Sequence, residues 1–218
     1  MSWWNPTVSA VAVALSATLA IWGHTPSRMR VHRFFKPVTI VIIIVTTMTL
    51  ADTPDRAYVA WLRAGLLLSL LGDVFLMIDD QWFSRGLVAF LFALVTYAIA
   101  LGRAAALNWH LAAYVVCPLL PALGILAWLW PRLGKYRPAV VIYVAAMTAM
   151  VLMAIARAAT PGVSFLSGLA GIAGALLFMT SDTLVARRRF AEPAAPYAVE
   201  LGAYFAAQWL LIATTWTG

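Results

Sequence analysis

The sequence predicts an all-α fold, a polytopic integral membrane bundle of eight transmembrane helices. Of its 218 residues, 64% are hydrophobic and only 11% are charged, whereas soluble domains carry about 25% charged residues. The apolar residues fall into runs close to the ~20 residues that a membrane-spanning helix needs. No polar or low-complexity stretch is long enough to separate two folding units, so we expect a single transmembrane domain over residues 1–218.

Eight apolar segments define the expected spans. They cover residues 6–23, 35–51, 57–78, 83–102, 110–131, 137–157, 163–186 and 197–216. The first segment lacks the positively charged leader of a signal peptide, and Trp3 and Trp4 precede it as interfacial aromatic residues do. We therefore expect the first segment to be retained as a span.

Lysine and arginine residues alternate between rich and poor connections. The rich connections hold Arg28, Arg30, Arg33, Lys36, Arg85, Arg132, Lys135, Arg137, Arg187, Arg188 and Arg189. The poor connections hold Arg56, Arg63, Arg103 and Arg157. Because cytoplasmic connections are enriched in these residues, this division of 11 to 4 predicts eight spans with both termini on the non-cytoplasmic side. The net charge of +7 then fits lipid head groups and topology, and we expect no nucleic-acid partner.

Two short internal matches raise the possibility of a duplication. FKP at residues 35–37 and YRP at 136–138 each open an expected span, and GDVFLM at 72–77 corresponds to SDTLVA at 181–186. Each match joins segments that are four spans apart, which fits a 4+4 parallel duplication of a four-helix unit. Matches this short also arise by chance in so apolar a sequence.

Two aspartates lie inside the expected spans. Asp73 precedes Asp79 by six residues and Asp182 precedes Arg187 by five, so both should lie roughly 7–9 Å inside the cytoplasmic helix ends. Ionisable residues in a span usually face the bundle interior or a water-filled cavity, and they mark functional sites. The alternative is an ion pair or hydrogen-bond cluster that only fixes helix packing. Lys36 begins the second expected span on the same side, where it can signal topology, bind phosphate or turn toward a carboxylate.

Other polar residues recur at helical spacing. The eighth expected span carries a stripe of four, and the fourth and sixth carry one tyrosine each: Tyr197, Glu200, Tyr204, Gln208, Tyr97 and Tyr143. Together with the two aspartates, they are expected to line one polar cavity open to the cytoplasmic leaflet. For the tyrosines the alternative is helix packing with a hydroxyl hydrogen bond, and for Glu200 and Gln208 it is a structural interhelical contact.

Cysteine and histidine limit the chemistry that this chain can perform. The single cysteine, Cys117, allows no intramolecular disulfide and no cysteine cluster. His24, His32 and His110 all fall in expected connections, which argues against a zinc site and leaves no base within a span to activate Ser181. We expect no metal and no cofactor. Acid–base chemistry by the two carboxylates is what is left, with one group holding a proton and the other accepting one.

Five motifs resemble the YhhN family, which contains the transmembrane lysoplasmalogenases. They are FKP in the second expected span, LLGDVFLM in the third, FSRGLVAFLFALVTY in the fourth, ALLFMTSDTLVA in the seventh and YFAAQWLLI in the eighth. The resemblance implies an intramembrane hydrolase that cleaves the vinyl ether bond of lysoplasmalogens to a fatty aldehyde and glycerophosphoethanolamine or glycerophosphocholine. It also implies a lysophospholipid substrate, contact with membrane lipids and a place in a bacterial inner membrane.

The resemblance also implies roles for individual residues. Carried over by position, Asp73 and Asp182 take the acidic positions of the GD and SD motifs, and Lys36 takes the lysine of the KP motif. Tyr204 and Gln208 match the polar motif of the last helix. Family members often carry a histidine in the fourth-span motif at the position of Leu94, so no role of that histidine applies to this chain.

These observations together define the expected site. Which aspartate acts as acid and which as base stays open, because coupled carboxylates titrate as a pair. The expected catalytic residues are Asp73 and Asp182, and the expected substrate-binding residues are Lys36, Tyr97, Tyr143, Tyr204 and Gln208.

A second class of function fits the same residues. A small proton-coupled transporter or lipid-binding protein would use the acids as a proton relay, and transporters are often built from repeats. Turnover in detergent would separate the two classes, because a transporter needs two compartments. A third possibility is a structural role in lipid homeostasis, for which buried acids would be unusual.

Overall fold

The computed structural model describes residues 6–48, 55–103, 105, 111–191 and 197–216. These residues form eight α-helices, which confirms the expected all-helical fold: α1 Pro6–Trp22, α2 Met29–Met48, α3 Arg56–Ile78, α4 Phe83–Arg103, α5 Leu111–Leu129, α6 Arg137–Ala158, α7 Phe165–Phe190 and α8 Tyr197–Ala213. Short 3-10 helices cover Asp80–Trp82, Trp130–Arg132 and Gly134–Tyr136. Within these residues, α2 to α7 are long and apolar enough to cross a membrane, and α1 and α8 are shorter apolar helices of 17 residues. The chain is an integral membrane protein.

Two helix boundaries differ from the expected ones by four residues or more. α2 begins at Met29 instead of residue 35, and α7 continues through three arginines to Phe190 instead of ending at residue 186. Apolar length marks only the membrane-buried part of a helix, whereas backbone hydrogen bonds continue into the head-group region where polar side chains are stable. Lys36 consequently lies about two turns inside α2 and not at its start. The expectations for Trp3, Trp4 and residues 49–51 and 110 lie outside the described residues.

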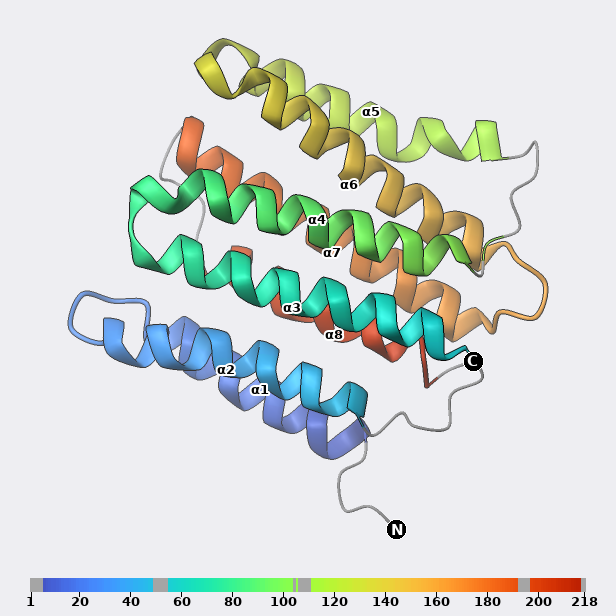
Figure 1. The fold of residues 1–218 in the computed structure, drawn as a ribbon, viewed down its shortest axis with the longest axis horizontal. Coiled ribbons are helices and arrows are strands. Elements are labelled where there is room, and N and C mark those ends of the chain that lie inside the picture. Colours follow the sequence, from blue (N-terminus) through green and yellow to red (C-terminus); the bar gives the residue numbers. More distant parts are fainter. Residues whose placement is uncertain (1–5, 49–54, 104, 106–110, 192–196, 217–218) are drawn as a thin grey trace.

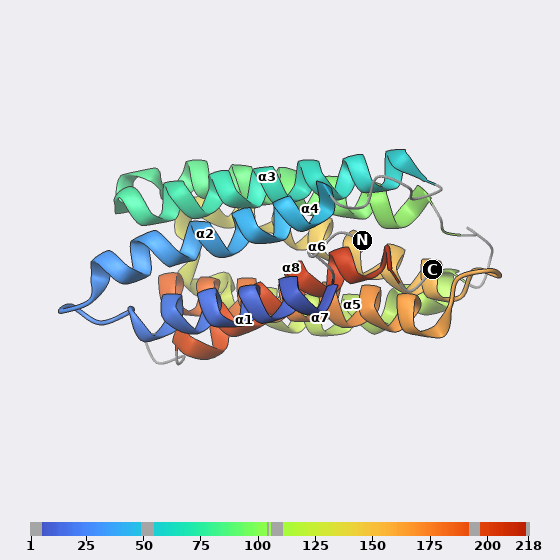
Figure 2. The same cartoon turned by 90° about the horizontal axis from the view of Figure 1, so that it is seen from below.

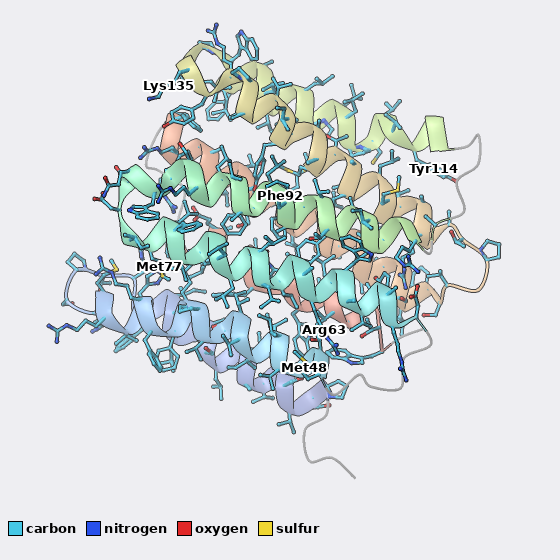
Figure 3. The ribbon with its side chains drawn as sticks, viewed as in Figure 1. Met48, Arg63, Met77, Phe92, Tyr114 and Lys135 are labelled. Atoms are coloured by element: carbon cyan, nitrogen blue, oxygen red, sulfur yellow. The ribbon has the colours of Figure 1, made fainter. Side chains whose placement is uncertain are left out.

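The helices are arranged in two layers. Figure 2 shows α2, α3, α4 and α6 in one layer and α1, α8, α7 and α5 in the other. Successive helices run in opposite directions, so α1, α3, α5 and α7 end, and α2, α4, α6 and α8 begin, at one end of the bundle, on the left in Figure 1. The eleven residues of the rich connections all belong to this end, which we call the basic end. Lys135 lies there, whereas Arg63 lies toward the opposite end (Figure 3).

Six helices form a closed ring of neighbours. α2 packs against α3, α3 against α4, α4 against α6, α6 against α7, α7 against α8, and α8 against α2. α1 packs against α2 and α8, and α5 against α6 and α7, so both lie outside the ring. Shifting every helix number by four reproduces the order of the ring, as a parallel duplication would. The duplication stays a prediction, and this order of neighbours supports it.

Two glycines on α3 let α4 approach closely. A Cβ atom at Gly65 would lie 2.2 Å from Cε1 of Tyr97, and one at Gly72 would lie 2.6 Å from the ring of Phe90. The Phe90 and Tyr97 rings also pack edge-on against the fully buried Phe178 of α7, with ring centroids 6.4 and 5.9 Å away. These aromatic contacts hold α3, α4 and α7 together beside the interior of the helix ring. Asp73 directly follows Gly72 in the sequence, so it lies next to these contacts.

Candidate active site

A cavity of about 330 Å³ lies inside the ring, toward its basic end. All six ring helices contribute to its wall, as does α5 through Ile125 and Leu129. Most of the wall is apolar, including Leu76, Phe90 and Met147. The charged residues of the wall are Arg33, Lys36, Asp73, Asp182, Arg188 and Glu200. The structure therefore brings both predicted catalytic aspartates to one chamber, together with Lys36, Tyr143 and Tyr204.

Asp73 is held by one cation and one hydroxyl group. Lys36 Nζ lies 3.0 Å from Asp73 Oδ1, and the Tyr204 hydroxyl donates to Asp73 Oδ2 at 2.7 Å. The Lys36 and Asp73 side chains are only 9% and 2% exposed. The sequence allowed Lys36 to signal topology, to bind phosphate or to turn toward a carboxylate. In the structure its ammonium points inward to Asp73 and balances the charge of that carboxylate. An ion pair this deeply buried is sensitive to loss of either partner.

Asp182 has a different environment. The Tyr143 hydroxyl of α6 donates to Asp182 Oδ2 at 2.5 Å. Across the described part of the chain, no lysine, arginine or histidine forms a salt bridge with Asp182. When every helix number is shifted by four, α2 corresponds to α6 and α3 corresponds to α7. The partner of Asp73 on α2 is thus a lysine, the partner of Asp182 on α6 is a tyrosine, and only one of the two acids is charge-balanced.

Tyr97 and Gln208 do not line the cavity, contrary to what their helical spacing suggested. Both are fully buried, and the Tyr97 hydroxyl donates to Gln208 Oε1 at 2.5 Å, with Ser69 Oγ 3.5 Å away. Helical spacing predicts which face a residue occupies but not its depth along the bundle. Tyr97 lies about 21 Å along α4 from Phe83, well beyond Phe90, the deepest α4 residue of the wall. The pair forms a layer behind the site.

Aromatic and histidine side chains surround the opening at the basic end. His24 stacks on Tyr197 with ring centroids 3.4 Å apart, and the Tyr197 hydroxyl lies 3.1 Å from His32 Nε2. His32 Nδ1 lies 2.8 Å from the Ala20 carbonyl oxygen. Because a carbonyl only accepts, Nδ1 carries the hydrogen, and Tyr197 donates to Nε2. These contacts hold the α1–α2 hairpin against the start of α8.

His32 corrects the prediction that every histidine lies in a connection. It belongs to α2, is 3% exposed and lies in the cavity wall. The prediction failed because it began α2 at residue 35. Both ring nitrogens of His32 are engaged with Ala20 and Tyr197, so His32 is not placed as a base for Ser181, which also lies in the wall. His110 lies outside the described residues.

Glu200 and Arg188 form a second ion pair in the wall. A guanidinium nitrogen of Arg188 contacts Glu200 Oε2, and the guanidinium also lies over the Tyr197 ring, 5.0 Å from its centroid. Glu200 therefore joins α7 to α8 near the opening. Within the described ranges, no three His, Cys, Asp or Glu side chains gather closely enough to hold a metal ion.

A comparison with known protein families identifies the family of the chain. A sequence profile of the YhhN family matches residues 31–215. The chain belongs to the YhhN family. Its match includes every ring helix and both wall aspartates, although it begins inside α2.

Proteins that are similar to this chain carry two kinds of name. Proteins named lysoplasmalogenase from Mycobacterium bovis and Mycobacterium tuberculosis are each 35% identical over 137 residues, which is 60% of this chain. The chain matches half the length of these two relatives. The protein named uncharacterized membrane protein YhhN from Escherichia coli O6:H1 is 26% identical over 211 residues, covering 94% of this chain and 96% of the relative. No solved structure matches the chain significantly.

Proposed function

We propose that this YhhN protein is an intramembrane hydrolase that cleaves the vinyl ether bond of lysoplasmalogens. The observation that carries the proposal is that Asp73 and Asp182 share one mostly apolar cavity, and that among the described residues Asp73 has a cationic partner whereas Asp182 has none. The names of the Mycobacterium relatives support the same reaction. A vinyl ether is acid-labile, so its hydrolysis needs a proton donor and a base that takes a proton from water, and it requires no metal and no nucleophilic side chain.

Asp182 is the proposed acid. A carboxyl group in an apolar wall without a salt-bridge partner is the better carrier of a proton, because no cation among the described residues forms a salt bridge that offsets its negative charge. The Tyr143 hydroxyl donates to Oδ2, which leaves Oδ1 to carry the proton toward the substrate. Asp73 is the proposed base. Lys36 balances its charge, and each of its oxygens keeps a lone pair free beyond the contacts with Lys36 and Tyr204.

The proposed reaction consumes one lysoplasmalogen and one water molecule and needs no other reactant. Asp182 protonates the β-carbon of the vinyl ether, and an oxocarbenium ion forms at the α-carbon. Water attacks that carbon and gives its proton to Asp73, which forms a hemiacetal. The hemiacetal hydroxyl then gives its proton to Asp182, the carbon–oxygen bond to glycerol breaks, and Asp73 gives its proton to the glycerol oxygen. The products are a fatty aldehyde and glycerophosphoethanolamine or glycerophosphocholine, and both carboxyl groups are back in their starting states.

The other residues have supporting roles in this proposal. Tyr143 and Tyr204 orient the two carboxyl groups, and Lys36 sets the charge of Asp73 and does not bind phosphate. Tyr97 and Gln208 act as positioning residues behind Tyr204, and not as substrate ligands. The apolar wall holds the alkenyl chain, as lipid-binding cavities do with a few polar groups to fix orientation.

The experiment is an assay of the purified protein in detergent with lysoplasmenylethanolamine. Mass spectrometry should detect a fatty aldehyde and glycerophosphoethanolamine. Asp73→Asn and Asp182→Asn should each lower the rate at least 100-fold, since each removes one member of the acid–base pair. Asp79→Asn is the matched control, because Asp79 ends α3 outside the cavity wall. If the wild type releases no aldehyde, or both site variants keep full activity, the proposal is wrong.

The same assay addresses the transporter alternative. The ring order fits a duplication, and repeats are common in transporters. A transporter would bind lipid in detergent without releasing aldehyde, because detergent offers no second compartment. Release of aldehyde that depends on Asp73 and Asp182 therefore separates the two functions.

A further inference from the structure

The charged residues of the cavity wall divide into two ion pairs and two single groups. Lys36 pairs with Asp73, and Arg188 pairs with Glu200. This leaves Arg33 and Asp182. In the described part of the protein, Arg33 forms no hydrogen bond and no ion pair, although it belongs to the wall and its side chain is exposed.

Arg33 lies at the opening of the cavity. It precedes Lys36 by three residues on α2, so the two side chains share one face of the helix. At 1.5 Å per residue, Arg33 starts about 4–5 Å nearer the basic end than Lys36, whose ammonium marks the level of Asp73. The backbone of Arg33 thus lies about one helical turn nearer the basic end than that of Lys36, whose ammonium contacts Asp73.

The neighbouring histidines do not duplicate the charge of Arg33. Partial burial and the positive charges around it, including Arg188 and Lys36, lower the pKa of His24 to about 4. His24 is therefore neutral at pH 7. His32 uses both ring nitrogens for Ala20 and Tyr197. Among the described wall residues, Arg33 is the cation left to meet an anionic ligand.

We propose that Arg33 is the binding site for the phosphate of a lysophospholipid head group, and that it fixes the depth at which the lipid enters the cavity. This inference rests on the proposed function and names a part of the same site. In an extended glycerophospholipid, the oxygen at the first glycerol carbon and the phosphorus are separated by roughly 5–6 Å, from bond lengths near 1.5 Å. That span is close to the offset of about 4–5 Å along α2 between Arg33 and Lys36, the salt-bridge partner of Asp73. A phosphate on Arg33 places the bond at the first glycerol carbon beside Asp182 and Asp73, with the chain among the apolar residues beyond.

Guanidinium is suited to this task. Its planar donors bind phosphate oxygens through charge-assisted hydrogen bonds, and it keeps its charge at every physiological pH. Arg33 recognises the phosphate itself, so ethanolamine and choline head groups should depend on it equally.

The test uses lipids that cannot be cleaved at a vinyl ether. Wild type, Arg33→Gln and Arg30→Gln are purified in the same detergent, and the binding of saturated acyl lysophosphatidylethanolamine is measured by thermophoresis. A monoacylglycerol with the same chain serves as the phosphate-free ligand. Arg30 is the matched control, because it is an exposed arginine on the same helix outside the cavity wall.

Arg33→Gln should weaken the binding of the lysophospholipid about tenfold and leave that of the monoacylglycerol unchanged, since one charge-assisted contact of about 1.4 kcal/mol is a factor of ten. Arg30→Gln should change neither. Equal weakening of both lipids, or no weakening of either, would overturn the phosphate site. Because no bond is cleaved, this result is independent of the hydrolase assay: a protein that binds phosphate through Arg33 and releases no aldehyde would contradict only the proposed function.

Discussion

Lys36 and Asp73 form a buried ion pair that joins α2 to α3 inside the proposed active site. Each side chain is nearly inaccessible, and each is the other's salt-bridge partner. In such a pair, desolvation offsets much of the attraction, so the intact pair adds little stability while a single unpaired charge is strongly unfavourable. The pair therefore constrains which substitutions the site accepts.

Lys36→Met should destabilise the protein by about 3 kcal/mol, because it leaves the Asp73 carboxylate in the wall without its cation. Thermal unfolding in detergent measures this effect as a lower Tm. The double variant Lys36→Met/Asp73→Asn should recover much of the lost stability, since it removes both charges. A double variant that loses the sum of the two single effects would contradict the coupling.

The two acids themselves could be predicted from the sequence, because a carboxylate within an apolar span is rare enough to signal a site. Their partners could not. Whether Tyr143 or Tyr97 reaches a carboxylate depends on the rotation and depth of each helix, and the spacing of residues along one helix does not determine either. The structure assigns Tyr143 to Asp182 and Tyr204 to Asp73, and leaves Tyr97 one layer deeper.

At the scale of helices, α3 packs closely against α4 at two glycines, where a larger residue would overlap an aromatic side chain of α4. The ring of Tyr97 occupies the space beside Gly65, and that of Phe90 the space beside Gly72. The small residue before Asp73 thus admits an aromatic ring of the neighbouring helix. These contacts keep Asp73 at a fixed distance from α4.

Gly65→Ala should lower stability by about 1–3 kcal/mol, because the added methyl group overlaps the fully buried ring of Tyr97. Gly202→Ala in α8 is the matched control. A Cβ at Gly202 meets nothing within 4 Å, so this change should leave stability unchanged or raise it by up to about 1 kcal/mol through helix propensity. Tm values in the same detergent compare the two, and equal values would show that α3 and α4 are not closely packed at Gly65.

The boundaries of α2 show where apolar length fails as a guide. The basic residues after Arg28 have the composition of a connection, yet α2 begins at Met29 and includes Arg33 and His32. Misplacing this boundary hid His32 and Arg33 from the predicted site. A helical reading of the spacing between Arg33 and Lys36, three residues apart, is the signal that could have included Arg33.

At the scale of the whole molecule, the distribution of charge predicts an orientation. The basic end contains eleven of the fifteen lysine and arginine residues, and the cavity opens near it. From the positive-inside rule we propose that this end faces the cytoplasm, beneath a bacterial inner membrane. The lipid would then enter from the cytoplasmic leaflet.

Cysteine labelling tests this orientation. In a Cys117→Ser background, Lys135→Cys lies at the basic end, and Pro161→Cys lies in the exposed turn between α6 and α7 at the other end. A membrane-impermeant maleimide should label Pro161→Cys in intact cells and Lys135→Cys only after permeabilisation. The reverse pattern would invert the proposed topology and place the cavity on the outer side.

The eight helices and the cavity's acidic residues could thus be predicted, since they depend on local composition. The ring, with α1 and α5 outside it, depends on contacts between distant segments such as α2 and α8. In the sequence, the two short motif matches were the only indication of the order of helices in the ring.

The unequal partners of the two aspartates have a consequence for the history of the chain. Two copies of α1 to α4, assembled around the same axis, would supply two lysine–aspartate pairs and no acid that keeps its proton. Two copies of α5 to α8 would supply two tyrosine-bound aspartates and no aspartate that is paired with a lysine. If the halves arose from one ancestor, they have since specialised, and separately expressed halves should complement each other while neither can replace its counterpart.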